Sequence, residues 1–126
     1  MAAKAAKIGP SLVGTVGRAY KAGVKIAFGT DAGVYPHGGN AAEFELMIRA
    51  GMPAMYVLQA ATIRGAELLH RQEELGSLTA GKWADVIAVP GNPLEDISLM
   101  NRVGFVMKSG SIYKRGGLPT ELASPP

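Results

Sequence analysis

The sequence predicts an α/β fold, and two stretches of its 126 residues carry that prediction. In the first half, residues 11–21 have the apolar spacing of a helix, and a tight turn leads from them into the apolar run 24–28, which is typical of a buried strand. A helix followed directly by a buried strand is half of a repeat unit in a parallel α/β fold. From Gly76 onward, short strands and tight turns predict a small antiparallel or mixed sheet.

The first helix is predicted to begin at Pro10 or Ser11, after a short basic lead-in, Lys4 to Pro10, which is either helical itself or irregular. Leu12, Val16 and Tyr20 recur at every fourth residue, so they form one apolar stripe on the helix surface. A glycine two residues after this helix is expected to end it, because glycine adopts the left-handed conformation that often follows a helix. The strand is therefore expected to start almost at once.

Two further helices are predicted between the strand and the sheet. Asn40 is a good N-cap residue, and Glu43 three positions later completes a variant of the capping box. The second helix opens at Pro53 and keeps an apolar face as far as Leu69. Three methionines are predicted to fill gaps in the core: Met47, Met52 and Met55.

Three short strands are predicted in the second half, at residues 86–89, 103–108 and 111–114. A turn at Ser109-Gly110 joins the last two. The stretch 116–126 contains glycine, proline and serine without periodicity, so it is expected to be a loosely ordered tail.

Composition and charge exclude several classes of function. The net charge is +3, but the 13 basic residues are scattered and form no stripe with aromatic residues, so nucleic-acid binding is not predicted. No apolar run approaches the roughly 20 residues that a membrane span needs, and the start of the chain lacks the centre of a secretory signal. The absence of cysteine excludes disulfides and thiolate metal sites. It fits a reducing compartment, such as the cytoplasm, but fits a short stretch of sequence equally well.

One acidic residue is a candidate for a catalytic or metal-binding role. Asp31 directly follows the predicted strand, in the run Gly29-Thr30-Asp31-Ala32-Gly33. One interpretation is turn chemistry, since aspartate bonds nearby backbone N–H groups and tolerates left-handed geometry. The other is that a parallel strand delivers Asp31 to its carboxyl end, where barrel and open-sheet enzymes place their catalytic residues. Asp31 would then be an oxygen ligand for a divalent metal, or a general base acting on water.

The two histidines differ in their surroundings. His37 lies in the glycine-rich loop after Asp31, so it is predicted to contact substrate, although a histidine in a surface loop is often without function. His70 lies at a predicted helix end, where a positive charge favourable to the helix dipole explains it better than metal ligation.

The GTDAG run at residues 29–33, the His37-Gly38 pair, and Asn40 with Glu43 together resemble the last barrel strand and following loop of the amidohydrolase superfamily. The similarity is greatest to its imidazolonepropionase-like and Xaa-Pro dipeptidase-like branch. The run GSLTAGKWAD at residues 76–85 and residues 108–113 resemble the closing strands of the β-sandwich that flanks the barrel in this family. Asp85 therefore looks structural, as a turn or backbone partner.

The resemblance implies a specific architecture and chemistry. Residues 1–75 would be the C-terminal part of a TIM-like (β/α)8 barrel with its last strand and flanking helices, and 76–115 part of the β-sandwich, before the tail. Asp31 would be a metal ligand and would take a proton from the attacking water. The implied cofactor is a divalent metal, zinc being expected, and the implied substrate is a dipeptide or a cyclic amide.

A hydrolytic zinc site generally needs three protein ligands, and this chain has two histidines, no cysteine and one suggestive aspartate. The other ligands that amidohydrolases use are absent, and the resemblance covers about the last quarter or third of the family. Two hypotheses follow. The chain is either a fragment of an amidohydrolase, inactive until a missing N-terminal barrel portion complements it, or a non-catalytic module that self-associates, as a homo-oligomer, through an exposed edge of the strand 24–28.

Overall fold

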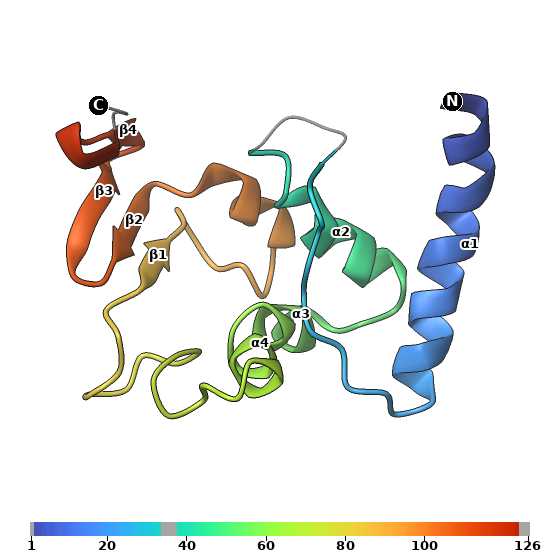
Figure 1. The fold of residues 1–126 in the computed structure, drawn as a ribbon. Coiled ribbons are helices and arrows are strands. Elements are labelled where there is room, and N and C mark those ends of the chain that lie inside the picture. The colour runs from blue at the N-terminus through green and yellow to red at the C-terminus, as the bar shows by residue number, and fades with distance from the viewer. Residues whose placement is uncertain (1, 34–37, 124–126) are drawn as a thin grey trace.

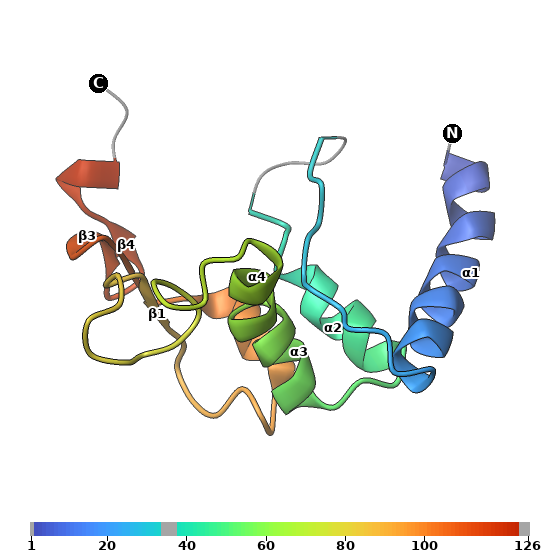
Figure 2. The same ribbon diagram turned by 60° about the horizontal axis from the view of Figure 1, so that its bottom comes forward.

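The computed structural model describes residues 2–33 and 38–123 (Figures 1 and 2). The helices are α1 (Ala2–Lys21), α2 (Ala42–Arg49), α3 (Ala54–Ala60) and α4 (Ile63–Leu68), with 3-10 helices η1 (Ile97–Arg102) and η2 (Glu121–Ala123). The strands are β1 (Val86–Ala88), β2 (Phe105–Lys108), β3 (Ser111–Arg115) and β4 (Leu118–Pro119). In both views α1 and the sheet lie at opposite ends of the molecule, with α2, α3 and α4 between them. No helix in these described ranges is long and apolar enough to cross a bilayer.

Helix α1 is longer than predicted. It begins at Ala2 and continues through Pro10, so the lead-in is helical and the predicted start at Pro10 or Ser11 is wrong. Alanine and lysine dominate its first turns and are strong helix formers, whereas Pro10 removes only one backbone hydrogen bond. The predicted end is confirmed, because the helix stops at Lys21 and Gly23 follows it with a φ of 80°.

Helix α1 meets the end of α2 through Gly17. A Cβ atom at Gly17 would lie 2.4 Å from the carbonyl oxygen of Ala50, so only glycine allows this approach of the two backbones. The apolar stripe predicted for this helix is only partly covered. Leu12 remains 60% exposed and Val16 37% exposed.

The long helix predicted from Pro53 to Leu69 is two helices in the structure. The break falls at Thr62, whose φ of −126° and ψ of −91° are not helical. The Thr62 hydroxyl donates to the Leu58 carbonyl at 2.7 Å, a side-chain bond that competes with the backbone ladder. The apolar face predicted for this region is not continuous either, since Leu69 is 64% exposed.

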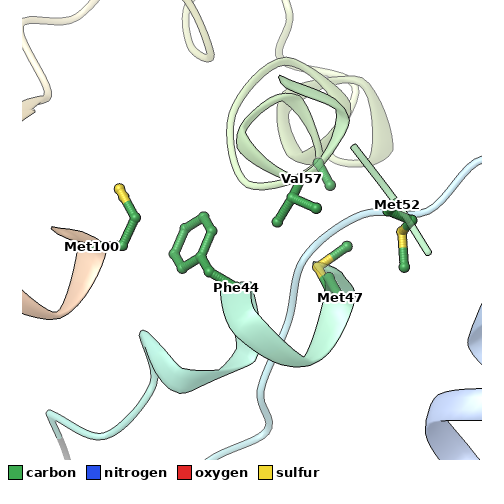
Figure 3. Packing of buried hydrophobic residues seen from close by; sticks show 6 residues of the cluster. Phe44, Met47, Met52, Val57 and Met100 are labelled. Atoms are coloured by element: carbon green, nitrogen blue, oxygen red, sulfur yellow. The ribbon is translucent and has the colours of Figure 1, made fainter. Parts of the chain in front are cut away.

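The core lies between α2, α3 and η1 (Figure 3). Its buried cluster consists of Phe44, Met47, Met52, Val57, Ala60 and Met100. Two of the three methionines predicted to fill the core, Met47 and Met52, are buried, whereas Met55 is 51% exposed. Phe28 packs on Phe44 with ring centroids 4.6 Å apart, which anchors the segment before Asp31 to this core.

The sheet is an antiparallel meander in the order β1-β2-β3-β4, so the antiparallel form of the prediction is confirmed. The expected loose tail from residue 116 is partly wrong, because β4 adds to the sheet. Thr120 then donates from its N–H to the Tyr113 carbonyl and from its hydroxyl to the Ile112 carbonyl, at 2.9 and 2.6 Å. These bonds hold the first part of the tail against β3. The predicted division into barrel and sandwich domains stays a prediction.

Candidate active site

Asp31 lies at the end of an extended segment, residues 24–30, that runs past α2 and α3 (Figures 1 and 2). The N–H of Ile26 donates to the Tyr56 hydroxyl at 3.3 Å, and the N–H of Phe28 donates to the Ala60 carbonyl at 3.0 Å. These bonds replace the ladder of a sheet. The predicted strand at 24–28 is therefore extended but pairs with no other strand of the described residues.

The backbone at Asp31 is in the left-handed region, with a φ of 45°. This conformation is uncommon for residues other than glycine, and aspartate is one of the few that tolerate it. The residue is exposed, so its carboxylate is accessible from solvent. Left-handed residues that are not glycine are found often at functional sites, where the surrounding structure holds them in place.

The Asn40 side chain connects the two stems of the loop that contains Asp31. Its Nδ2 donates to the Thr30 hydroxyl at 2.8 Å, and its Oδ1 accepts from the Gly38 N–H at 3.2 Å. Thr30 immediately precedes Asp31, and Gly38 lies on the far side of the loop. One carboxamide thus joins both stems, and we call these three residues the Asn40 clamp.

The clamp corrects the prediction that Asn40 and Glu43 form a capping box. The N-cap position of α2 is Ala41, and no side chain caps the helix. Asn40 is unavailable for capping because both ends of its carboxamide are turned to the loop. Its bond to Gly38 joins residues two positions apart, whereas its bond to Thr30, ten residues away, has no signal in the sequence.

The two histidines do not join Asp31 in a described cluster. His37, the predicted substrate contact, lies outside the described residues. His70 follows α4 with a φ of 55° and is exposed. It lines a cavity of about 410 Å³ together with Lys25 and Arg64, near the beginning of the extended segment whose other end carries Asp31. The prediction that a favourable charge at the helix end explains His70 stays a prediction.

The donor atoms needed for a metal site are incomplete in residues 2–33 and 38–123. No three histidine, aspartate or glutamate side chains of these ranges gather around one point. Asp31 offers one oxygen ligand, and a hydrolytic zinc site generally needs three protein ligands. The described residues therefore fit a divalent metal only as one part of a larger ligand set.

Asp85 has the structural role that the sequence predicts. Its Oδ1 accepts from the Ser109 N–H at 2.7 Å, and the Gly110 N–H donates to the Ala84 carbonyl at 3.1 Å. Ser109 has a φ of 49° in the turn between β2 and β3. Asp85 thus fixes this turn and takes no part in the site around Asp31.

A family model of the amidohydrolase family matches residues 3–113, which include the extended segment, Asp31, the clamp and most of the sheet. The chain belongs to the amidohydrolase family. The resemblance in the GTDAG run and in residues 76–85 is thereby confirmed. The fold is a partial α/β arrangement with an antiparallel sheet, shared with solved structures of this family.

Individual members of the family are similar over most of this chain. A crystal structure of a Xaa-Pro dipeptidase with bound methionine in its active site is 53% identical, with a TM-score of 0.83, over 88% of this chain and 27% of that protein. Ochratoxinase from Aspergillus niger is 40% identical over 105 residues, which are 79% of this chain and 22% of the enzyme. Its crystal structure matches with a TM-score of 0.74. Imidazolonepropionase from Shouchella clausii is 37% identical over 68 residues. The chain thus spans about a quarter of the length of the dipeptidase and of ochratoxinase.

Proposed function

We propose that this chain supplies Asp31 to the active site of a metal-dependent amidohydrolase that cleaves an amide C–N bond. The observation that carries the proposal is the exposed Asp31, held in a left-handed conformation at the end of an extended segment in a chain of this family. Relatives named Xaa-Pro dipeptidase and imidazolonepropionase favour a dipeptide or a cyclic amide as substrate.

The proposed chemistry assigns two roles to the Asp31 carboxylate. It is one ligand of a divalent metal, expected to be zinc, which when bound lowers the pKa of water and polarises a carbonyl oxygen. It also accepts a proton from the water whose oxygen attacks the amide carbonyl carbon. As the C–N bond breaks, the leaving nitrogen takes up that proton. His37 is proposed as a substrate contact on the basis of its place in the loop.

The remaining ligands and the neighbouring strands are proposed to come from a further portion of a (β/α)8 barrel. Two features of the extended segment support this. The described residues offer no backbone partner to the N–H groups of Lys25 and Ala27, which alternate with the bonded ones of Ile26 and Phe28. A strand with one free edge can pair with a neighbour. Val24 is also 52% exposed beside this edge.

The test is a chimera in which this chain replaces the matching quarter of the Xaa-Pro dipeptidase that is 53% identical to it. The chimera is expected to hydrolyse Xaa-Pro dipeptides and to contain a divalent metal. Asp31→Asn should lower kcat/KM by about 1000-fold or more, because it removes a charged ligand and the proton acceptor together. Asp85→Asn is the matched control, since Asp85 only fixes a turn. A folded wild-type chimera without activity, or an active Asp31→Asn variant, would contradict the proposal.

A second candidate function is a non-catalytic module that self-associates. It is favoured by the incomplete metal ligand set of the described residues and by large exposed apolar side chains such as Leu12 and Leu68. The mass in solution of the purified chain and the behaviour of the chimera distinguish the two. A stable homo-oligomer of the chain, together with a folded chimera that is inactive and free of metal, supports the module. Hydrolysis and bound metal in the chimera that are both lost in Asp31→Asn support the enzyme.

A further inference from the structure

We infer that Asn40 is a positioning residue for Asp31: its carboxamide ties Thr30 to Gly38 and so fixes the direction in which the Asp31 carboxylate points. The inference rests on the proposed function of Asp31, which it deepens by naming the group that orients this carboxylate. It uses three observations together, namely the left-handed φ at Asp31 and the two hydrogen bonds of Asn40.

The clamp acts on Asp31 because one of its members, Thr30, directly precedes Asp31 in the chain. Thr30 is covalently joined to Asp31, and its hydroxyl is the atom that Asn40 binds, at 2.8 Å. The bond therefore holds Thr30, from which the chain enters Asp31, in place relative to Asn40 and Gly38. Because Asn40 is only partly exposed and precedes α2 by two residues, the clamp is attached to the helical core.

Asparagine suits this place because it accepts from one partner and donates to the other. The Gly38 N–H can only donate, so it needs an acceptor, and the Thr30 hydroxyl accepts here from an amide N–H. A carboxamide offers both groups on one planar unit without adding charge beside Asp31. Alanine offers neither, and aspartate would add a negative charge close to the carboxylate that is to be positioned.

Asn92 serves as a comparison, because its side chain makes hydrogen bonds only to residues near it in the sequence. Asn92 also makes two bonds, from its Nδ2 to Glu95 at 2.9 Å and from the Leu94 N–H to its Oδ1 at 3.1 Å. Both partners lie within three residues of it, and the turn is in the region of the sheet. Asn92→Ala therefore removes the same kinds of hydrogen bond as Asn40→Ala but leaves the contacts of the loop that contains Asp31 unchanged.

The first experiment measures the backbone of Asp31 in the full chain by NMR. A residue with positive φ holds its own amide and α protons close together, so Asp31 should show a strong intraresidue cross-relaxation signal. We expect Asn40→Ala to reduce this signal to that of the extended residues before it, and Thr30→Val to reduce it in the same direction. Thr30→Ser, which keeps the hydroxyl, and Asn92→Ala should leave it unchanged.

The outcomes separate a positioning role from general loosening. An unchanged Asp31 signal in folded Asn40→Ala overturns the inference, and so does an equal loss in Asn92→Ala. If Asn40→Ala fails to fold, Thr30→Val tests the inference in its place, because it removes only the hydroxyl that Asn40 binds. An unchanged signal in Thr30→Val then overturns the inference as well.

Activity of the dipeptidase chimera gives an independent readout. Asn40→Ala should lower kcat by about 10- to 100-fold while KM changes by less than about threefold, because a misplaced carboxylate slows chemistry more than binding. Thr30→Ser should retain kcat and Thr30→Val should lose it. An unchanged kcat in an active chimera carrying Asn40→Ala overturns the inference. An inactive wild-type chimera contradicts only the proposed function, and the NMR result still decides whether Asn40 holds Asp31.

Discussion

The sheet and the helical part of this chain meet the same requirement, the pairing of backbone polar groups, in different ways. In the sheet, β2 pairs with β1 on one side and with β3 on the other, so its backbone groups are bonded within a ladder that has one irregularity, between Val106 and Met107 on the β3 side. In the helical part, the extended segment that leads to Asp31 has no strand beside it in the described ranges. It is held by the Tyr56 hydroxyl and the Ala60 carbonyl.

Side-chain burial is greater in the helical part than in the sheet, which is the reverse of the contrast in backbone pairing. The buried core cluster comes from α2, α3 and the residues next to them, with one member, Met100, from η1. The strands of the sheet have no fully buried residue, and Ile87 in β1 is 51% exposed. The sheet is therefore well bonded and poorly buried, whereas the helical part is well buried around a segment that lacks a ladder. The candidate site depends on packing, because packing is what holds that segment.

The largest effect is expected from removing a core side chain beside that segment. Phe44 is 7% exposed and packs on Phe28, so Phe44→Ala should reduce the free energy of unfolding by about 3–5 kcal/mol. Ile87→Ala in the half-exposed sheet is the control and should cost less than about 1.5 kcal/mol. Urea unfolding of both variants checks this difference. Similar losses in the two variants would contradict the contrast between a buried helical part and an exposed sheet.

A smaller effect is expected where α1 meets α2. Gly17→Ala places a methyl group 2.4 Å from the Ala50 carbonyl oxygen, so the helices must separate, at an expected loss of about 1–3 kcal/mol. Gly14→Ala is the matched control on the same helix. Its methyl group would have only the flexible end of Arg18 nearby, at 3.7 Å, so higher helix propensity should stabilise the chain by up to about 1 kcal/mol. Thermal unfolding measures both, and the two changes should have opposite signs.

The same contrast explains which features could be predicted from the sequence. Helix periodicity and turn residues are local signals, so the end of α1, the short strands β1 to β3 and the role of Asp85 were predictable. Asp31 was predictable as a candidate because glycines flank it after an apolar run. The break at Thr62 was not, because the periodic apolar pattern continues across it, and the hydroxyl bond to Leu58 that accompanies it depends on one side-chain rotamer.

Features that depend on residues far apart in the sequence could not be predicted, because sequence patterns report local preferences and not which distant residues meet. The bond from Asn40 to Thr30 joins residues ten positions apart, and a residue type that often caps helices gave the wrong expectation. Burial was overestimated for Met55 and Leu69, because an apolar pattern shows which face prefers to be covered but not whether a covering element is present. The strand at 24–28 was predicted from its composition, whereas its pairing requires a neighbour that composition cannot supply.

The smallest effect concerns η1, which brings Met100 from the sheet side into the helical core. Asp96 caps this helix and accepts from the Ser98 hydroxyl and the Ser98 N–H, at 2.6 and 3.0 Å. These bonds, with a smaller contribution from the charge of Arg102, lower the pKa of Asp96 below its usual value. A carboxyl group with a depressed pKa in the folded state stabilises the fold above its unfolded pKa of about 3.9, and this contribution is lost as the pH falls through the folded pKa.

The wild-type chain should therefore be slightly more stable than Asp96→Asn at about pH 6, and the difference should shrink toward about pH 2, because protonation removes the charge of Asp96. Asparagine retains an acceptor for the Ser98 N–H, so the variant should fold. Because Asp96 is exposed, added salt should reduce the small difference at the higher pH. Urea unfolding at the two pH values measures it. A difference that persists in acid would mean that the cap acts through shape and not through charge, and that the junction between sheet and core is independent of pH.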